Sequence, residues 1–357
     1  NYLQSSAEAA AAGVLFLAIH ARCAAAQVQI TQGRLHLAEQ SCRQAIQLAE
    51  GVRLPPLGLV WIVLGGIALE RNDLTAAERL LQDGIALARR GGLMDDVVVG
   101  LAFLARLRAH LAPGDKTGAL AAIQEAQAII RGYGVERMDI LAAAHLARLQ
   151  LYMGQKQAAA QWVATYQAVR GDSRREFEEL TLARILLASG QLEPLPDILH
   201  PLLEKATAAG QGQTCIEVML LLALFYQAKQ DPRAALEWLG HSLRLAAPEG
   251  YARLFLDEGQ PLLDLLPKAR QAAPEFVDTL LGMSQPDRGA LAALPDPLSE
   301  QELRVLHLIV AGKSNQEIAA ELVISVGTAK WHVHNILQKL GVSNRPQAIA
   351  RARALGL

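Results

Sequence analysis

Several polar side chains in one short segment near the carboxyl end are able to hydrogen-bond the edges of base pairs. Lys330, Trp331, His334, Asn335 and Gln338 recur at spacings that place them on one side of an α-helix. A lysine can donate to guanine O6 and N7, imidazole and amide groups can bond base edges or phosphates, and an indole can pack on a thymine methyl. The chemistry expected of this helix is therefore recognition of DNA.

We assign base reading to Lys330, Trp331 and His334. Contacts to the DNA backbone are expected from the same helix and from two helix N-termini, whose unpaired N–H groups attract phosphate. The backbone candidates are Lys313, Ser314, Asn315, Ser325, Thr328, Asn335 and Gln338. The other side of the helix is apolar, and we expect it to face inward through Val326, Ala329, Val333, Ile336, Leu337 and Leu340.

Capping signals divide residues 298–357 into four expected helices, because a capping side chain marks the first turn of a helix. The caps are Ser299 with Glu302, Ser314 with Glu317, Ser325 with Thr328, and Asn344 with Gln347. Only Val323 and Ile324 separate the second helix from the third, which is the tight connection of a helix-turn-helix. Residues 296–357 hold seven Lys/Arg and five Asp/Glu, so the formal charge of this end is +2.

A second pattern occupies the first 250 residues, where one segment recurs. Its copies begin at Gly33, Asn72, Gly114, Gly154, Gly190 and Gln230. Alanine stands five residues after the start in five of the six copies. A small residue stands seven residues before the start, also in five of the six copies. Small residues on both sides of a turn let two antiparallel helices approach closely, so the pattern predicts stacked helical hairpins. The concave surface of such a solenoid suits a ligand, although a spacer without a ligand is the alternative.

Composition favours an all-α protein without a catalytic centre. Hydrophobic residues make up 52% of the chain and aromatic residues only 4%. Cys23, Cys42 and Cys215 are scattered and the histidines lack ligand spacing, so we predict no disulfide, no metal site and no cofactor in this chain. Neither a Ser-His-Asp set nor a phosphate-binding glycine loop is found, which argues against an enzyme.

The lengths of the apolar stretches and the identity of the first residue bear on where the protein is located and on what precedes this chain. The longest apolar stretches fall short of the roughly 20 residues that span a bilayer. We therefore expect no membrane partner, and the scattered cysteines indicate a reducing cytoplasm. The chain starts at Asn1 without a methionine, and we expect a further segment upstream, where any nucleotide-binding ATPase module would lie.

Residues 298–357 resemble a LuxR-type domain. The resemblance rests on the LSxxExxVL start, the SNxEIA second helix, the ISVGTxKxHxxNIxxKLGV third helix and the QAxARA fourth helix. The repeats resemble tetratricopeptide (TPR) repeats with elongated helices, and the whole chain is similar to the large ATP-binding LuxR regulators of the MalT type. The resemblance implies self-association on DNA through the fourth helix, which begins at Arg345 and reaches Leu355.

The expected architecture is an all-α TPR-like solenoid followed by a four-helix LuxR-type helix-turn-helix domain. We predict a repeat domain over residues 1–283, a proline-containing linker over 284–297, and the DNA-binding domain over 298–357. The expected function is a transcription regulator, an activator, whose array senses a small molecule or a protein of unidentified chemistry. Double-stranded DNA is its expected partner and RNA polymerase a candidate. The alternative is a TPR-like adaptor for proteins whose carboxyl-terminal helices serve association.

Overall fold

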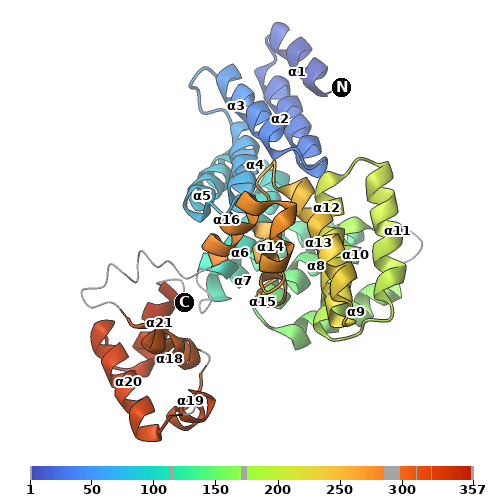
Figure 1. Ribbon diagram of the computed structural model, residues 1–357. Coiled ribbons are helices and arrows are strands. Elements are labelled where there is room, and N and C mark those ends of the chain that lie inside the picture. The colour runs from blue at the N-terminus through green and yellow to red at the C-terminus, as the bar shows by residue number, and fades with distance from the viewer. Residues whose placement is uncertain are drawn as a thin grey trace. The chain divides into compact units, whose positions relative to one another are not determined.

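The computed structural model describes residues 2–111, 116–169, 175–284, 298–310, 312–322 and 324–354 (Figure 1). Throughout these residues the regular secondary structure is helical, which confirms the predicted fold class. The described residues fall into two compact units, the first reaching Leu281 and the second beginning at Gly282. The predicted linker lies, from residue 285 onward, outside the described residues, and the proposed domain boundaries stay a prediction.

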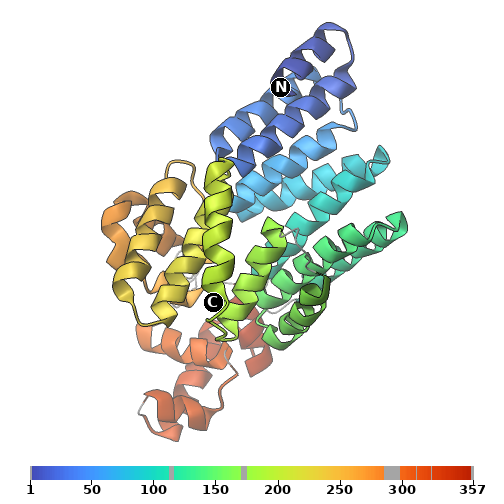
Figure 2. The same cartoon turned by 90° about the vertical axis from the view of Figure 1, so that its right-hand side faces the viewer.

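The first unit consists of antiparallel helix pairs that stack side by side (Figure 2). A first helix, α1 (Tyr2–Ala11), packs on α2. The pairs are α2 (Leu15–Thr31) with α3 (Leu35–Leu48), α4 (Leu57–Glu70) with α5 (Leu74–Arg90), α6 (Met94–Leu111) with α7 (Lys116–Tyr133), α8 (Glu136–Tyr152) with α9 (Lys156–Val169), α10 (Glu176–Ala188) with α11 (Leu195–Ala208), and α12 (Gly212–Ala228) with α13 (Pro232–Ala246).

The repeat starts read from the sequence are the turns of these pairs. Gly33, Asn72, Gly154, Gly190 and Gln230 all have positive φ, between 61° and 79°. The predicted turn at Gly114 lies outside the described residues. The recurring alanines Ala38, Ala77, Ala119, Ala159 and Ala235 have no exposed surface, so they do sit where paired helices meet. The TPR-like array is thereby confirmed.

The array coils far enough for its first and last helix pairs to meet. α12 packs against α2, and the hydroxyl of Tyr251 donates to the carbonyl oxygen of Ile30 at 3.1 Å. Short helices follow the last pair, namely α14 (Arg253–Leu256), α15 (Gln260–Leu263), the 3-10 helix η1 (Leu266–Ala272) and α16 (Pro274–Ser284). Phe255 of α14 is completely buried. These short helices also contact the interior of the array, because α14 packs on α4 and α12.

The second unit contains α18 (Glu300–Val310), α19 (Asn315–Leu322), α20 (Val326–Lys339) and α21 (Arg345–Ala354), the four helices that the caps predict. Its core is apolar and draws on every helix, through Val305, Leu306, Ile309, Ile318, Ala329, Ile336, Ala348 and Ala352. Leu355, the predicted end of the last helix, lies outside the described residues.

The three cysteines are buried as free thiols. Within the ranges that the structure describes, no cluster of histidine, cysteine and carboxylate side chains is arranged to hold a metal ion. None of the helices in those ranges combines the length and apolarity needed to cross a bilayer.

Candidate DNA-binding interface

Reciprocal capping boxes fix the first turns of α18 and α19. The amide of Ser299 donates to Glu302 Oε2 at 2.8 Å, and the amide of Glu302 donates to Ser299 Oγ at 3.3 Å. Ser314 and Glu317 repeat the arrangement at 2.7 and 3.3 Å. Each box satisfies N–H groups that a helix start would leave unpaired, so both helices begin where the sequence predicts.

The third helix of the domain is held at a tight corner with the second. α19 ends at Leu322 and α20 begins at Val326, while Val323 lies outside the described residues. Ser325 caps α20 by accepting from the amide of Thr328 at 3.0 Å. α20 packs against α18, α19 and α21, which leaves one side of it uncovered. This is the bihelical geometry of a helix-turn-helix, with α20 in the position of the recognition helix.

The uncovered side of α20 carries the predicted base-reading residues. Lys330, His334 and Gln338 are exposed, and the Trp331 side chain is 59% exposed. Asn335 is half-buried. A large indole left in water is unusual for a monomeric domain and typical of a surface that meets a partner.

The apolar side of α20 agrees with the sequence except at its first residue. Ala329, Ile336 and Leu340 are buried, and Val333 and Leu337 pack at the edge of the core. Val326 was expected to face inward, and this prediction was wrong, since it is 40% exposed. Val326 is the first residue of α20, and the next residue on this side, Ala329, is completely buried.

The charge around α20 is one-sided. From Ser325 onward the chain contains Lys330, Lys339, Arg345, Arg351 and Arg353 and not one aspartate or glutamate. The acidic residues of the domain belong to the preceding helices α18 and α19. The modest overall charge of the domain therefore hides a segment that attracts a polyanion.

The two predicted phosphate-binding helix starts differ in the structure. At α19 the amide of Ser314 already donates to the Glu317 carboxylate. This backbone hydrogen bond has the largest effect on the pKa of Glu317 and, with the side-chain hydrogen bond to Ser314, lowers it. Lys313 Nζ lies 3.8 Å from Glu321 Oε2, and Asn315 Oδ1 accepts from Arg345 at 3.3 Å. A phosphate approaching α19 would meet fixed negative charge.

No acidic side chain belongs to the first turn of α20. The hydroxyls of Ser325 and Thr328 lie 2.8 Å apart at the exposed end of the helix. This start therefore suits a phosphate better than the start of α19 does.

An ion pair between α18 and α20 fixes the orientation of the recognition helix. Lys339 Nζ donates to Glu302 Oε2 at 2.9 Å, and the Glu302 side chain is almost completely buried. Burial alone would raise the pKa of Glu302, but the hydrogen bonds from the Ser299 backbone and from Lys339 outweigh it and lower the pKa. α20 is thus held at both ends, by the Ser325 cap and by Lys339.

A cluster of charged side chains inside the array was not predicted from the sequence. Arg184 Nη2 lies 3.0 Å from Glu217 Oε2 and 2.7 Å from Glu258 Oε1. The cluster joins α4, α6, α8, α10, α12 and α14, and its charged members are Glu70, Arg106, Arg148, Arg184, Glu217, Arg253, Asp257 and Glu258. A signal was present, because Glu70 and Glu217 are single charges in otherwise apolar helices and need buried partners.

Comparison with known proteins matches both units. The family model of the MalT-like TPR region matches residues 1–272, and that of the luxR family of bacterial regulatory proteins matches residues 296–352. A similar curated protein is the HTH-type transcriptional regulator MalT of Serratia proteamaculans (strain 568), which is 27% identical over 365 aligned residues. The alignment covers 92% of this chain and 40% of that protein, so the chain spans about two fifths of the relative's length.

Proposed function

The chain belongs to the family of MalT-like TPR regions and ends in a luxR-family regulatory domain, and from this premise we propose that it activates transcription in response to a signal received by its array. The observation that carries the proposal is the exposed side of α20, where Lys330, Trp331 and His334 stand clear of the domain. In this proposal α20 enters the major groove, and these three side chains contact base edges.

Phosphate contacts position the domain on the duplex. We propose the start of α20 as the main backbone contact, through Ser325 and Thr328, with Asn335 and Gln338 farther along the helix. Lys313 and Asn315 contribute less, because Glu321 and Arg345 already engage them. Ser314 is the weakest of the candidates, since its amide is committed to Glu317.

Two copies of the domain act as a pair. Residues 296–357 carry a formal charge of only +2 and can neutralise few phosphates, so a single copy would bind weakly at physiological salt. The fourth helix is the proposed contact between copies. Ala348 and Ala352 of α21 are turned into the domain core, and Gln347 and Arg351 are exposed and available to a second copy. The paired domains would bind a repeated or palindromic site, from which RNA polymerase could be recruited.

The experiment that tests this function starts from DNA selection. Duplexes would be selected from a random pool by the full chain, and the chain's affinity for a selected duplex and a scrambled duplex would be compared by gel shift at two salt concentrations. We expect a preference for the selected duplex and two copies of the chain per site. Equal affinity for both duplexes, or no complex at the lower salt, would reject the proposal and favour the TPR-like adaptor.

A further inference from the structure

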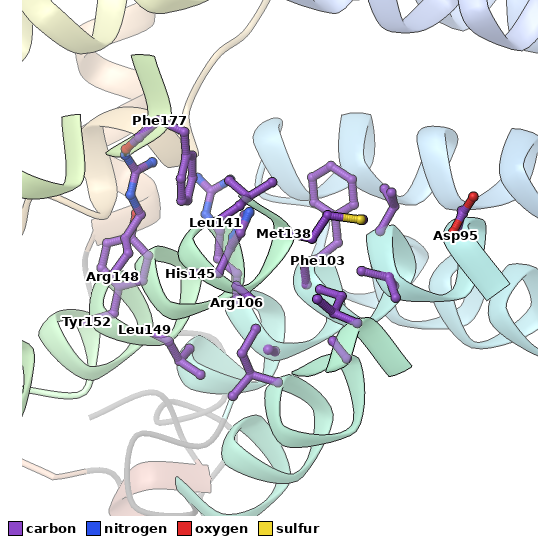
Figure 3. A pocket seen from close by; sticks show the side chains of 18 of the residues that line it. Asp95, Phe103, Arg106, Met138, Leu141, His145, Arg148, Leu149, Tyr152 and Phe177 are labelled. Atoms are coloured by element: carbon purple, nitrogen blue, oxygen red, sulfur yellow. The ribbon is translucent and has the colours of Figure 1, made fainter. Parts of the chain in front are cut away.

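A cavity of about 580 Å³ lies inside the array (Figure 3). Side chains of α6, α7 and α8 form most of its wall, and α4, α10, α12 and α14 complete it. All of these elements belong to the first unit. The volume falls within the roughly 300–1,000 Å³ of sites that hold a small molecule.

Most of the lining is apolar. The wall includes Val98, Ala102, Phe103, Ile130, Met138 and Leu141. A ligand with many hydroxyl groups would lose hydrogen bonds to water against such a wall without replacing them. The lining therefore selects a ligand whose surface is mainly apolar.

Polar groups gather at one end of the cavity. Figure 3 shows Arg148, His145 and Tyr152 close to Phe177, whereas Asp95 lies at the far side, beyond Met138 and Phe103. Asp95 is exposed to solvent, so water screens its charge. The polar end is the part of the cavity where a ligand's polar group could be recognised.

The charges at that end are already paired. Arg148 donates to Glu217 at 3.3 Å, to Thr181 at 3.1 Å and to the Phe177 carbonyl at 3.3 Å. Arg106 is bound by Glu70 and Asp257 in the same way. Each of these charges is already opposed by another, so a charged ligand would gain no unpaired counter-charge and would pay for its own desolvation, although Glu70 Oε2 itself has no hydrogen-bond partner in the described part of the chain.

His145 is one of the lining polar groups that remain available, together with the Tyr152 hydroxyl and Glu70 Oε2, for which the described residues provide no hydrogen-bond partner. It stacks on Phe177 with ring centroids 4.0 Å apart, and its ring nitrogens have no hydrogen-bond partner among the described residues. Burial, with a smaller effect from Arg148, lowers the pKa of His145 to about 3. The ring is therefore uncharged at neutral pH, with one N–H donor and one acceptor nitrogen.

We propose that this cavity binds an uncharged, predominantly apolar small molecule whose one polar group hydrogen-bonds His145. The proposal rests on the function proposed above and gives a chemical class to the signal that the array receives. It follows from the apolar wall, from the paired guanidinium groups and from the unpartnered imidazole, all of which lie in one cavity.

Two fluorescent probes with a common framework test the ligand class on the full chain. N-phenyl-1-naphthylamine is uncharged, and 1-anilinonaphthalene-8-sulfonate adds one sulfonate to it. We expect the uncharged probe to saturate one site per chain and to bind roughly tenfold or more tightly than the sulfonate, because no free cation offsets the burial of the anion. Failure of the uncharged probe to saturate, or equal or tighter binding of the sulfonate, would overturn the proposal.

Cavity-filling variants test the location. Ala102→Trp would fill the cavity, and Ala160→Trp, on the exposed side of α9, is the matched control. Ala102→Trp should lower the affinity for the uncharged probe roughly tenfold or more, since it removes the space that the probe needs. Ala160→Trp should leave that affinity unchanged. Val99→Trp provides a second filling variant if Ala102→Trp does not fold, because Val99 lines the cavity but is already 36% exposed. Unchanged probe binding in the folded filling variant would reject this cavity.

The outcome separates this inference from the proposed function. Probe binding does not involve α20, and the gel shift does not require a ligand in the array. Selective DNA binding without probe binding would refute only the ligand class, whereas probe binding without selective DNA binding would refute only the regulator.

Discussion

Asp257 accepts a hydrogen bond from Arg106 across 151 positions of sequence, with 2.8 Å between Nε and Oδ2. The same carboxylate accepts from Arg253 of α14, the short helix just before it, and lies 3.1 Å from His110 Nε2. Burial alone would raise the pKa of Asp257, but Arg106, His110 and Arg253 outweigh it and hold the pKa well below its usual range. One carboxylate thus fastens the segment after the last helix pair to α6 in the middle of the array.

Replacing that carboxylate should destabilise the array. Asp257→Asn removes the carboxylate that pairs with the buried Arg253 and one of the two carboxylates that pair with Arg106, and breaking a buried pair from one side costs about 3–5 kcal/mol. Urea denaturation should show a clearly lower midpoint. The control is Asp278→Asn, whose partner Arg270 is exposed, and its midpoint should not change measurably. Equal midpoints for the two variants would mean that the Asp257 cluster does not hold the array together.

Two glycines allow α4 and α5 to touch. A Cβ on Gly84 would lie 2.7 Å from the carbonyl oxygen of Gly58 and 2.9 Å from the amide of Ile62. Gly84→Ala must push the two helices apart, so we expect a loss of about 1–3 kcal/mol in the free energy of unfolding.

Gly132→Ala is the matched control for this close contact. Gly132 lies in the last turn of α7, and nothing is within 4 Å of the position a Cβ would take. Alanine should stabilise that helix by up to about 1 kcal/mol, because it restricts the unfolded chain more than glycine does. The free energy of unfolding, measured by urea denaturation, should fall in Gly84→Ala and rise in Gly132→Ala. A change of the same sign in both variants would contradict the close approach of α4 and α5.

Acid should loosen the attachment of α20. The pKa of Glu302 is lowered in the folded domain, so its ion pair with Lys339 stabilises fully above the unfolded pKa of about 4.3 and is lost as the pH falls through the folded pKa. Glu302→Gln should speed amide hydrogen exchange in α20 at pH 7, and the difference from wild type should shrink as the pH approaches 3. A difference that persists at low pH would assign the effect to packing.

Local features of the structure were predictable from sequence. The turns at Gly33 and Asn72 and the capping boxes at Ser299 and Ser314 depend on residues a few positions apart, and each is present in the structure. Helical periodicity likewise predicted which side of α20 is buried. It failed at Val326, the first residue of the helix, because periodicity does not show which residues the neighbouring helices cover.

Features built from distant segments were not predictable. Glu70 and Arg106 lie on α4 and α6, whereas Asp257 directly follows α14, and only the coiling of the array brings Asp257 to the other two. Ser314 illustrates a different difficulty, since the sequence marked it both as a helix cap and as a phosphate contact. The two roles compete for one amide, and the structure shows the cap formed.

The most direct test of the account is whether Lys330 discriminates between DNA sequences. The affinity of the full chain for a selected and a scrambled duplex would be measured for wild type, Lys330→Ala and Lys229→Ala, the last an exposed lysine of the array. We predict that Lys330→Ala weakens binding to the selected duplex roughly tenfold or more and abolishes most of the preference, while Lys229→Ala keeps it. A Lys330→Ala chain that retains the wild-type preference would contradict the assignment of α20 as the reading helix.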